Sequence, residues 1–191
     1  MALTLISTPL NITTSDTAVS TVDITSGIDN TYSVYEFHFY NIHPETTSSI
    51  FSFQVNADGG SGFNENITST TFEAEHDESD SGTAIQYRTN RDQSDDAEFQ
   101  QLGEYIGNPS NENDLSGSGI LTLYEPSSST YVKHWVSTFS AVGNNVEQIS
   151  YHTGYINTTT AITQISFKMT ANDMSAQGNI EAGTIKLFGV S

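Results

Sequence analysis

Apolar and polar residues alternate with a period of two along most of this chain. In the run IFSFQVNA, Phe51, Phe53 and Val55 share one face and polar residues share the other, and VYEFHFYNI repeats the pattern. This period places successive side chains on opposite faces of a β-strand. Gly, Asn, Asp and Ser separate about ten or eleven such runs, a spacing typical of sandwiches and barrels. We therefore predict an all-β protein: one antiparallel β-sandwich domain of jelly-roll type, spanning residues 1–191.

Two segments carry more specific expectations. The stretch of about residues 58–118 is rich in acids, Asn, Ser and Gly, which predicts long acidic loops. Within it, residues 94–107 (SDDAEFQQLGEYIG) place Phe99, Leu102 and Ile106 at i, i+3 and i+7, which predicts at most a turn or two of helix. Near the C-terminus, Gly178 and Asn179 are suited to a turn, so we expect residues 162–169 and the last strand to form a hairpin.

The charge balance excludes several classes of partner. Five Lys and Arg residues face 23 Asp and Glu residues, which gives a formal net charge of −18. Such a charge repels phosphate backbones and anionic lipid surfaces, so we expect no nucleic acid and no membrane among the partners. The N-terminal residues MALTLISTPLNITT have neither a basic region nor a long apolar run, so we expect no signal peptide. No stretch of the sequence approaches 18 apolar residues, so we expect no transmembrane segment.

The sequence offers little that indicates catalysis. It has no cysteine, no G-x-S-x-G motif and no H-E-x-x-H motif, and its five histidines stand singly. For His38, His134 and His152, which lie in aromatic strands, a place on a sheet face or in the core is the favoured interpretation. Glu73 and Glu75 would share a strand face, as paired glycosidase carboxylates do, but the residues HDESD that follow break that motif. We expect no catalytic residues and no enzyme activity.

Acidic loops are also the natural candidates for a metal site. Glu75, Asp77 and Asp80 are the candidate ligands, and calcium is the ion that their oxygen atoms would favour. The spacing does not match an EF-hand, and the favoured alternative is a charged turn that protects a sheet edge from wrong pairing. No other cofactor is expected.

Aromatic residues leave a third kind of site open. Tyr occurs 9 times, Phe 10 times and Trp once, at Trp135. Aromatic rings stack on sugars, yet a sandwich core uses the same residues. Trp135 shares a strand face with Tyr131 and Phe139, which favours the core, and a surface glycan remains an alternative ligand.

Four segments resemble a family of small structural proteins from marine tailed phages, including phages of cyanobacteria. The matching residues are IDNTYSVYEFHFYNIHP (28–44), SGSGILTLYEPSSSTYVKHW (116–135), GYINTTTAITQISFKM (154–169) and NIEAGTIKLFGV (179–190). The resemblance implies a virion protein built on a β-sandwich and made in the host cytoplasm. It implies a capsid decoration protein or a tail or fibre component, and it supplies no catalytic residues.

The resemblance also directs the expectation about partners. A virion protein meets many identical neighbours, so the expected partners are further copies of itself, in a symmetric homo-oligomer, and other virion proteins. The alternative is a lectin-like, receptor-binding module of a tail fibre. The acidic segments Glu73 to Asp80 and Arg91 to Asp114 are expected at the surface, with Arg88 and Arg91 as the nearest counter-charges.

Overall fold

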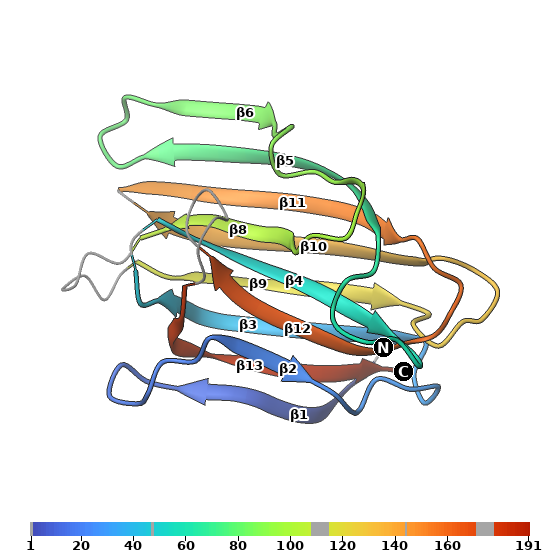
Figure 1. Cartoon of the computed structure of the whole chain (residues 1–191). Coiled ribbons are helices and arrows are strands. Elements are labelled where there is room, and N and C mark those ends of the chain that lie inside the picture. Colours follow the sequence, from blue (N-terminus) through green and yellow to red (C-terminus); the bar gives the residue numbers. More distant parts are fainter. Residues whose placement is uncertain (1, 47, 108–114, 144, 171–177) are drawn as a thin grey trace.

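Two antiparallel sheets make up the chain. The computed structural model describes residues 2–46, 48–107, 115–143, 145–170 and 178–191. The larger sheet runs in the order β1-β13-β3-β9-β10-β11-β5-β6, with β7 paired to β5 (Figure 1). Its strands are β1 (Leu3–Ile12), β13 (Ile180–Val190), β3 (Val34–Pro44), β9 (Gly117–Tyr124), β10 (Lys133–Gly143), β11 (Val146–Ile156), β5 (Ile67–Asp77), β6 (Thr83–Tyr87) and β7 (Ser94–Asp96).

The smaller sheet covers part of one face of the larger sheet. Its order is β2-β12-β4-β8, from the strands β2 (Thr21–Ile24), β12 (Ile162–Thr170), β4 (Ser49–Ala57) and β8 (Gln100–Ile106). The strands β5 and β6 extend beyond it, and the two chain ends lie side by side because β1 pairs with β13 (Figure 1). The described residues contain no helix, and the prediction of an all-β antiparallel sandwich is confirmed.

Aromatic rings from both sheets form the core between them. Phe39 of β3 lies 5.1 Å from the ring centroid of Phe51 on β4 and 5.1 Å from that of Phe167 on β12. Phe53 and Trp135 meet edge to face at 5.1 Å, the geometry that the ring quadrupoles favour. One contiguous core therefore joins the sheets, and its side chains come from the inward positions of the alternating runs.

The region expected to contain the long acidic loops, about residues 58–118, also contains strands. Strands β5, β6, β7 and β8 lie in it, and the helical turn predicted for residues 94–107 is absent because β7 and β8 occupy those positions. The same residues also fit a period of two, with Leu102 and Ile106 both buried. Pairing with β4 decided between the two periods, and Gly103, a poor helix residue, lies against the ring of Phe139.

The predicted C-terminal hairpin is wrong. Strand β13 pairs with β1 and β3 in the larger sheet, while β12 pairs with β2 and β4 in the smaller one. Isolated alternation cannot distinguish a hairpin from two strands that face each other, because both put the apolar residues on one side. Ile165 and Ile185 are both buried, but they enter the core from opposite sheets.

Candidate functional site: the open face of the large sheet

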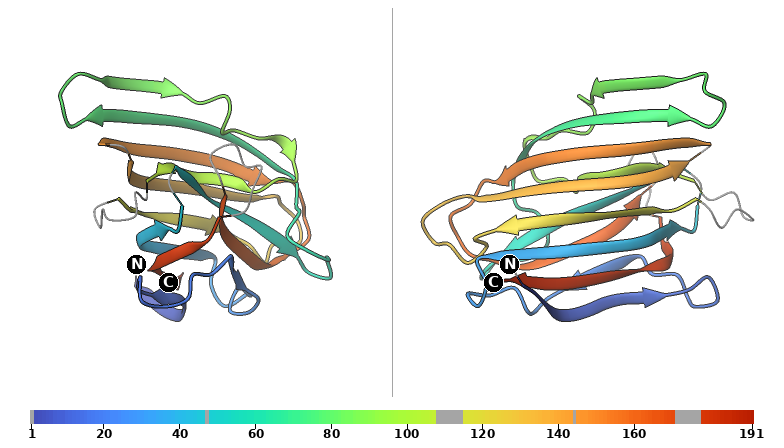
Figure 2. Two further views of the ribbon diagram at one scale, coloured as in Figure 1. Left: turned by 60° about the vertical axis from the view of Figure 1, so that its left-hand side comes forward. Right: turned by 180° about the vertical axis from the view of Figure 1, so that it is seen from behind.

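The outer face of the large sheet is uncovered. Side chains at alternate strand positions point away from the smaller sheet, and in the view from behind no described segment crosses in front of them (Figure 2). We call this surface, formed by the outward positions of β1, β13, β3, β9, β10, β11, β5 and β6, the open face. Eight strands at about 4.8 Å spacing and about 30 Å in length give it an area of roughly 1,000 Å².

Exposed apolar side chains gather on the open face. Of the large apolar side chains that are exposed in the described residues, all but Tyr131 lie at its outward positions, and Ile85 is 81% exposed. Register establishes this, because each pairs across the strands with another outward residue. They are Leu3, Leu5, Tyr40, Phe72, Ile85, Tyr87, Ile120, Tyr124, Val136 and Tyr151.

Some of these side chains already pack on one another. The rings of Phe72 and Tyr151, on adjacent strands, stack with centroids 4.8 Å apart and an interplanar angle of 10°. Tyr87 is the cross-strand partner of Phe72 on β6. The hydroxyl of Tyr87 donates a hydrogen bond of 2.5 Å to Asp92. A contiguous apolar patch of this kind marks an interaction surface more often than a solvated one.

The outer face of the smaller sheet differs because the chain itself covers part of it. Gln54 of β4 is fully buried on that side. Its amide nitrogen donates hydrogen bonds to the main-chain oxygens of Glu65, Ala97 and Glu98, at 2.8–3.0 Å. Lys168 of β12 lies with its ammonium 3.8 Å from the centre of the Phe99 ring. Polar residues and local loops thus complete the smaller sheet, whereas the larger sheet presents its apolar outer face to solvent.

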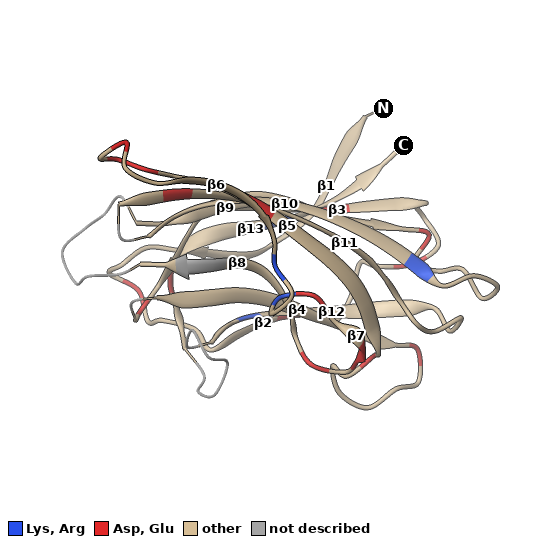
Figure 3. Cartoon of the chain, turned by 90° about the horizontal axis from the view of Figure 1, so that it is seen from above, with Lys and Arg blue, Asp and Glu red and all other residues tan. Residues whose placement is uncertain are grey.

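Carboxylates are scarce on the open face although the chain carries 23 acids. Glu36 and Glu147 hold outward positions, while Glu73, Glu75 and Asp77 of β5 alternate inward. Most of the acidic segments lie on loops and strand ends (Figure 3). The open face is therefore nearly neutral on a strongly acidic molecule.

A small polar cluster interrupts the apolar surface on β3 and β13. The imidazole of His38 lies 2.7 Å from Glu36 through Nε2 and 3.2 Å from the Tyr40 hydroxyl through Nδ1. Phe188 contacts the same imidazole, with ring centroids 4.7 Å apart. The ammonium of Lys186 lies over the ring of Tyr40, 5.4 Å from its centre. With one lysine and one glutamate, this cluster adds little net charge.

Beside this cluster the open face has a shallow hollow. Its volume is about 380 Å³, and it lies over β3, β9 and β10 in the middle of the sheet. Ile120 and Val136 supply apolar walls, and Glu36 supplies a carboxylate. The hydroxyls of Ser118, Thr122, Thr138 and Ser140 complete the lining. The hollow can accept a small polar group as well as an apolar side chain.

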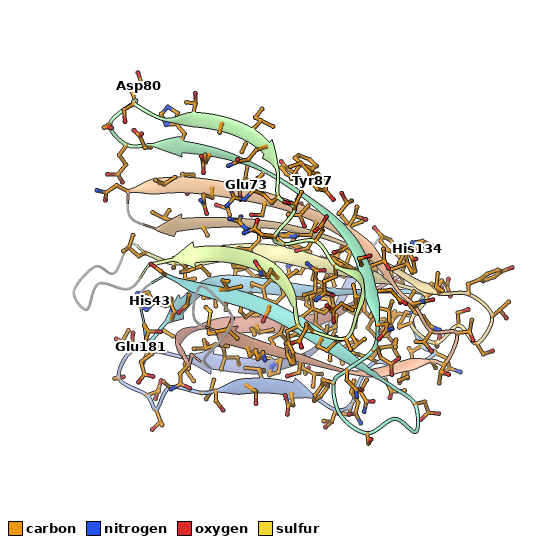
Figure 4. All side chains as sticks on the ribbon, turned by 45° about the horizontal axis from the view of Figure 1, so that its top comes forward. His43, Glu73, Asp80, Tyr87, His134 and Glu181 are labelled. Atoms are coloured by element: carbon orange, nitrogen blue, oxygen red, sulfur yellow. The ribbon has the colours of Figure 1, made fainter. Side chains whose placement is uncertain are left out.

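The acidic stretch Glu73 to Asp80, at the end of β5 and in the turn after it, does not lie wholly at the surface, which corrects the expectation for Glu73. Its side chain is fully buried, and its carboxylate meets two cations: Nε of Arg88 lies 3.2 Å from Oε1, and Nη1 of Arg91 contacts Oε2. Gln86 also donates a hydrogen bond of 3.2 Å to Oε1. Burial raises the pKa of Glu73, and the charge of Arg88 opposes that effect. Glu73 therefore takes part in a buried ion cluster rather than in a pair of catalytic carboxylates (Figure 4).

The same cluster corrects the expectation for Arg91. This residue is buried, not exposed, and its segment crosses the inner side of β5. The side chain of Gln100 donates a hydrogen bond of 3.0 Å to the main-chain oxygen of Arg91. Thr71 of β5 donates another to the same oxygen, at 3.4 Å. The segment closes the end of the sandwich that the smaller sheet leaves uncovered. Residues 108–114, also expected at the surface, lie outside the described residues.

The candidate calcium ligands lie near one turn but have separate partners. Hydrogen bonds from the side chain and main chain of Ser81 hold the pKa of Asp77 well below its usual value. Asp80, at the tip of the turn, lies 3.2 Å from Nε2 of His76 (Figure 4). Glu75 lies on β5, before the turn. Across the described ranges, no three His, Asp or Glu side chains gather in a way that could hold a metal ion. The calcium site stays a prediction.

The aromatic and histidine assignments are partly confirmed. Trp135 and Phe139 are buried in the core as expected, but Tyr131, in the loop before β10, is 74% exposed. His152 is buried on β11, where its Nδ1 lies 2.9 Å from the hydroxyl of Thr71, and burial lowers its pKa to about 4. His134, by contrast, holds an outward position on the open face (Figure 4).

Comparison of the chain with known proteins found no relative. No family model matches the chain, and neither a curated protein nor a solved structure matches it. Among the described residues there is also no helix long and apolar enough to cross a bilayer.

Proposed function

We propose that this chain is a non-enzymatic structural protein of a tailed-phage virion, either a capsid decoration protein or a tail-associated component. The observation that carries the proposal is the open face: roughly 1,000 Å² of exposed, nearly neutral sheet on an otherwise acidic protein. A single specific interface needs about 800 Å² per partner, so the open face is large enough for one. The resemblance of four segments to virion proteins of marine phages gives the class of assembly.

The strand order supports the same proposal. Four strands of the large sheet lie in the order β1-β13-β3-β9, and the four strands of the smaller sheet lie in the order β2-β12-β4-β8. Along the chain these eight strands run β1, β2, β3, β4, β8, β9, β12, β13, and the chain changes sheet at every step except from β4 to β8. We propose that these eight strands form a jelly roll into which β5–β7 and β10–β11 are inserted. Jelly rolls occur in viral capsid proteins and in lectins, which is an argument by analogy of fold.

The charge distribution fits a component of a particle's exterior. Acidic loops around an acid-poor face discourage contact with nucleic acid during assembly and direct association to that one face. Glu73 and Glu75 are the best candidate pair of hydrolytic carboxylates, but Glu73 is paired with Arg88 and Arg91 in the buried ion cluster.

The direct test is the composition of purified particles. Virions of the phage that encodes the chain, purified on a density gradient, should contain the protein at a fixed ratio to the major capsid or tail protein, measured by quantitative mass spectrometry. Immunogold labelling would then place it on the head or the tail. Presence in the infected-cell lysate together with absence from purified particles would overturn the proposal.

Glycan binding is the second candidate, and the hollow favours it. Hydroxyl groups and the Glu36 carboxylate suit the hydrogen bonds of a sugar, and the rings of Tyr40 and His38 lie beside them. In that case the wild-type protein should bind members of a glycan array, and Glu36→Gln should weaken binding by about tenfold, the loss of one charge-assisted hydrogen bond. Failure of the wild-type protein to bind any glycan would leave the hollow without this role.

A further inference from the structure

We infer that the open face binds the open face of a second copy of this chain, so that two molecules pack sheet to sheet about a two-fold axis. This inference deepens the proposed function by naming the partner and the surface through which the protein assembles. A two-fold interface uses the same patch on both molecules, so a single self-complementary surface is enough to build it.

Charge is the first argument for a second copy. Two molecules that each carry −18 repel one another wherever their acidic loops approach. On the open face, outward carboxylates are limited to Glu36 and Glu147 in β1, β3, β5, β6, β9, β10 and β11. Lys186 of β13, the cross-strand partner of His38, offsets one of these two charges. Contact through this face therefore brings the smallest number of like charges together.

Size and chemistry are the second argument. The exposed residues at outward positions are mainly aromatic and β-branched, which matches the apolar interior of a stable interface better than it matches a solvated sheet. Two twisted antiparallel sheets pack face to face about 10 Å apart, with their strands nearly aligned. The estimated area of roughly 1,000 Å² per molecule is somewhat larger than the roughly 800 Å² per partner that a standard interface buries.

The chemistry of the face disfavours other occupants. A cationic partner would bind where carboxylates are dense, and most of them lie on loops and strand ends, with two at outward positions of the open face. A sugar would occupy the hollow but would leave Phe72, Ile85 and Tyr87, at the far edge of the sheet, exposed. A second open face covers both regions at once.

If the two open faces overlap completely, the two-fold axis must pass through the centre of the open face. The eight strands have their midpoint between β9 and β10, where Ile120 and Thr138 are cross-strand partners. Both residues line the hollow. They should therefore lie near their own copies at the centre of the interface, which makes them the most sensitive positions for a test.

The experiment is sedimentation velocity on the purified protein over a wide range of concentration. The wild type should form dimers, and added salt should tighten them, because screening removes repulsion between the two acidic molecules. Ile120→Glu should raise the dissociation constant by about 30-fold or more, as expected for loss of a central apolar contact. Tyr131→Glu is the matched control: it adds the same charge at an exposed position off the open face, and its dimer should match the wild type.

A second variant separates the interface from net charge. Thr138→Lys removes one unit of net negative charge, so general repulsion alone would predict tighter dimers, whereas a central interface predicts dissociation. Near-ultraviolet circular dichroism would establish that each variant is folded. A wild type that stays monomeric at every concentration and salt level, or a dimer that tolerates both central variants, would overturn the inference. Neither result bears on whether the protein is found in virions, which the particle composition decides separately.

Discussion

Replacing Glu73 by Gln removes one negative charge from inside the protein and leaves the shape of the side chain almost unchanged. In the wild type the carboxylate is fully buried, with Arg88 and Arg91 against its two oxygens. In the variant both guanidinium groups lose the charge of the Glu73 carboxylate, and Arg91 lies in an almost completely buried position. The variant should therefore fold less stably.

The expected loss can be estimated from the burial of each partner. Removing one member of a buried ion pair costs about 3–5 kcal/mol. Gln retains one oxygen acceptor, Arg88 is partly exposed, and the desolvation of the ionised carboxylate, which raises the pKa of Glu73, no longer opposes folding. These three effects place the loss near the lower limit, about 3 kcal/mol. For a chain of this size that corresponds to a fall in melting temperature of about 6–12 °C.

The assay is urea denaturation followed by tryptophan fluorescence, because Trp135 is the one Trp in the chain and lies in the core. Glu75→Gln is the matched control: it makes the same chemical change two residues along the same strand, on the same side of the sheet, at a partly exposed position. It should shift stability by no more than about 0.5 kcal/mol. The difference between the two variants isolates burial from the relief of general repulsion.

Equal stability of Glu73→Gln and Glu75→Gln would refute this reasoning. It would mean that the cost of burying the three charged groups cancels their attraction, so that the cluster contributes no net stability. A gain in stability in Glu73→Gln would show that desolvation exceeds the attraction, as it does in some buried ion pairs.

Packing, protonation and topology lead to further outcomes. Gly117→Ala should destabilise the protein by about 1–3 kcal/mol, because the added Cβ would overlap the ring of Phe139, while Gly178→Ala should shift the melting temperature little; equal melting temperatures would contradict this. Between pH 6.5 and pH 4 the protein should lose about 3 kcal/mol of stability, because burial lowers the pKa of His152 to about 4 and the unfolded chain takes up the proton first. A urea series that gave the same pH slope for His152→Gln would exclude that cause. Ending the chain before Ile185 should abolish cooperative unfolding, because β13 lies between β1 and β3; a soluble truncated chain that melts like the wild type would rule this out.

Local alternation in the sequence was sufficient for the element type and for the core. The inward and outward positions of β3, β4 and β10 follow from residues two apart, so Phe51, Phe53, Trp135 and Phe139 could be assigned to the core before any pairing was known. The outward aromatic residues of the open face could be identified by the same rule. What the rule does not reveal is whether another element covers them.

The placement of Glu73 shows why the remaining features required the tertiary structure. A strand of alternating acids looks like a solvated face, and the nearby Arg88 and Arg91 look like surface counter-charges. Their burial depends on the segment after β6, which folds back under β5 and closes the end of the sandwich. The path of this segment depends on contacts between residues far apart in the chain, and the local alternation of apolar and polar residues does not predict such contacts.

The amino-acid sequence by itself determined that this protein is all-β, strongly acidic and built around an aromatic core, because a period of two and the charge count are local properties of the chain. Only the tertiary structure decided which strands share a sheet, that β12 and β13 face each other instead of pairing, and that one face of the large sheet stays open. These features depend on which of many equally alternating strands meet. That choice is made by the joint packing of residues far apart in the chain, such as Phe39 against Phe167.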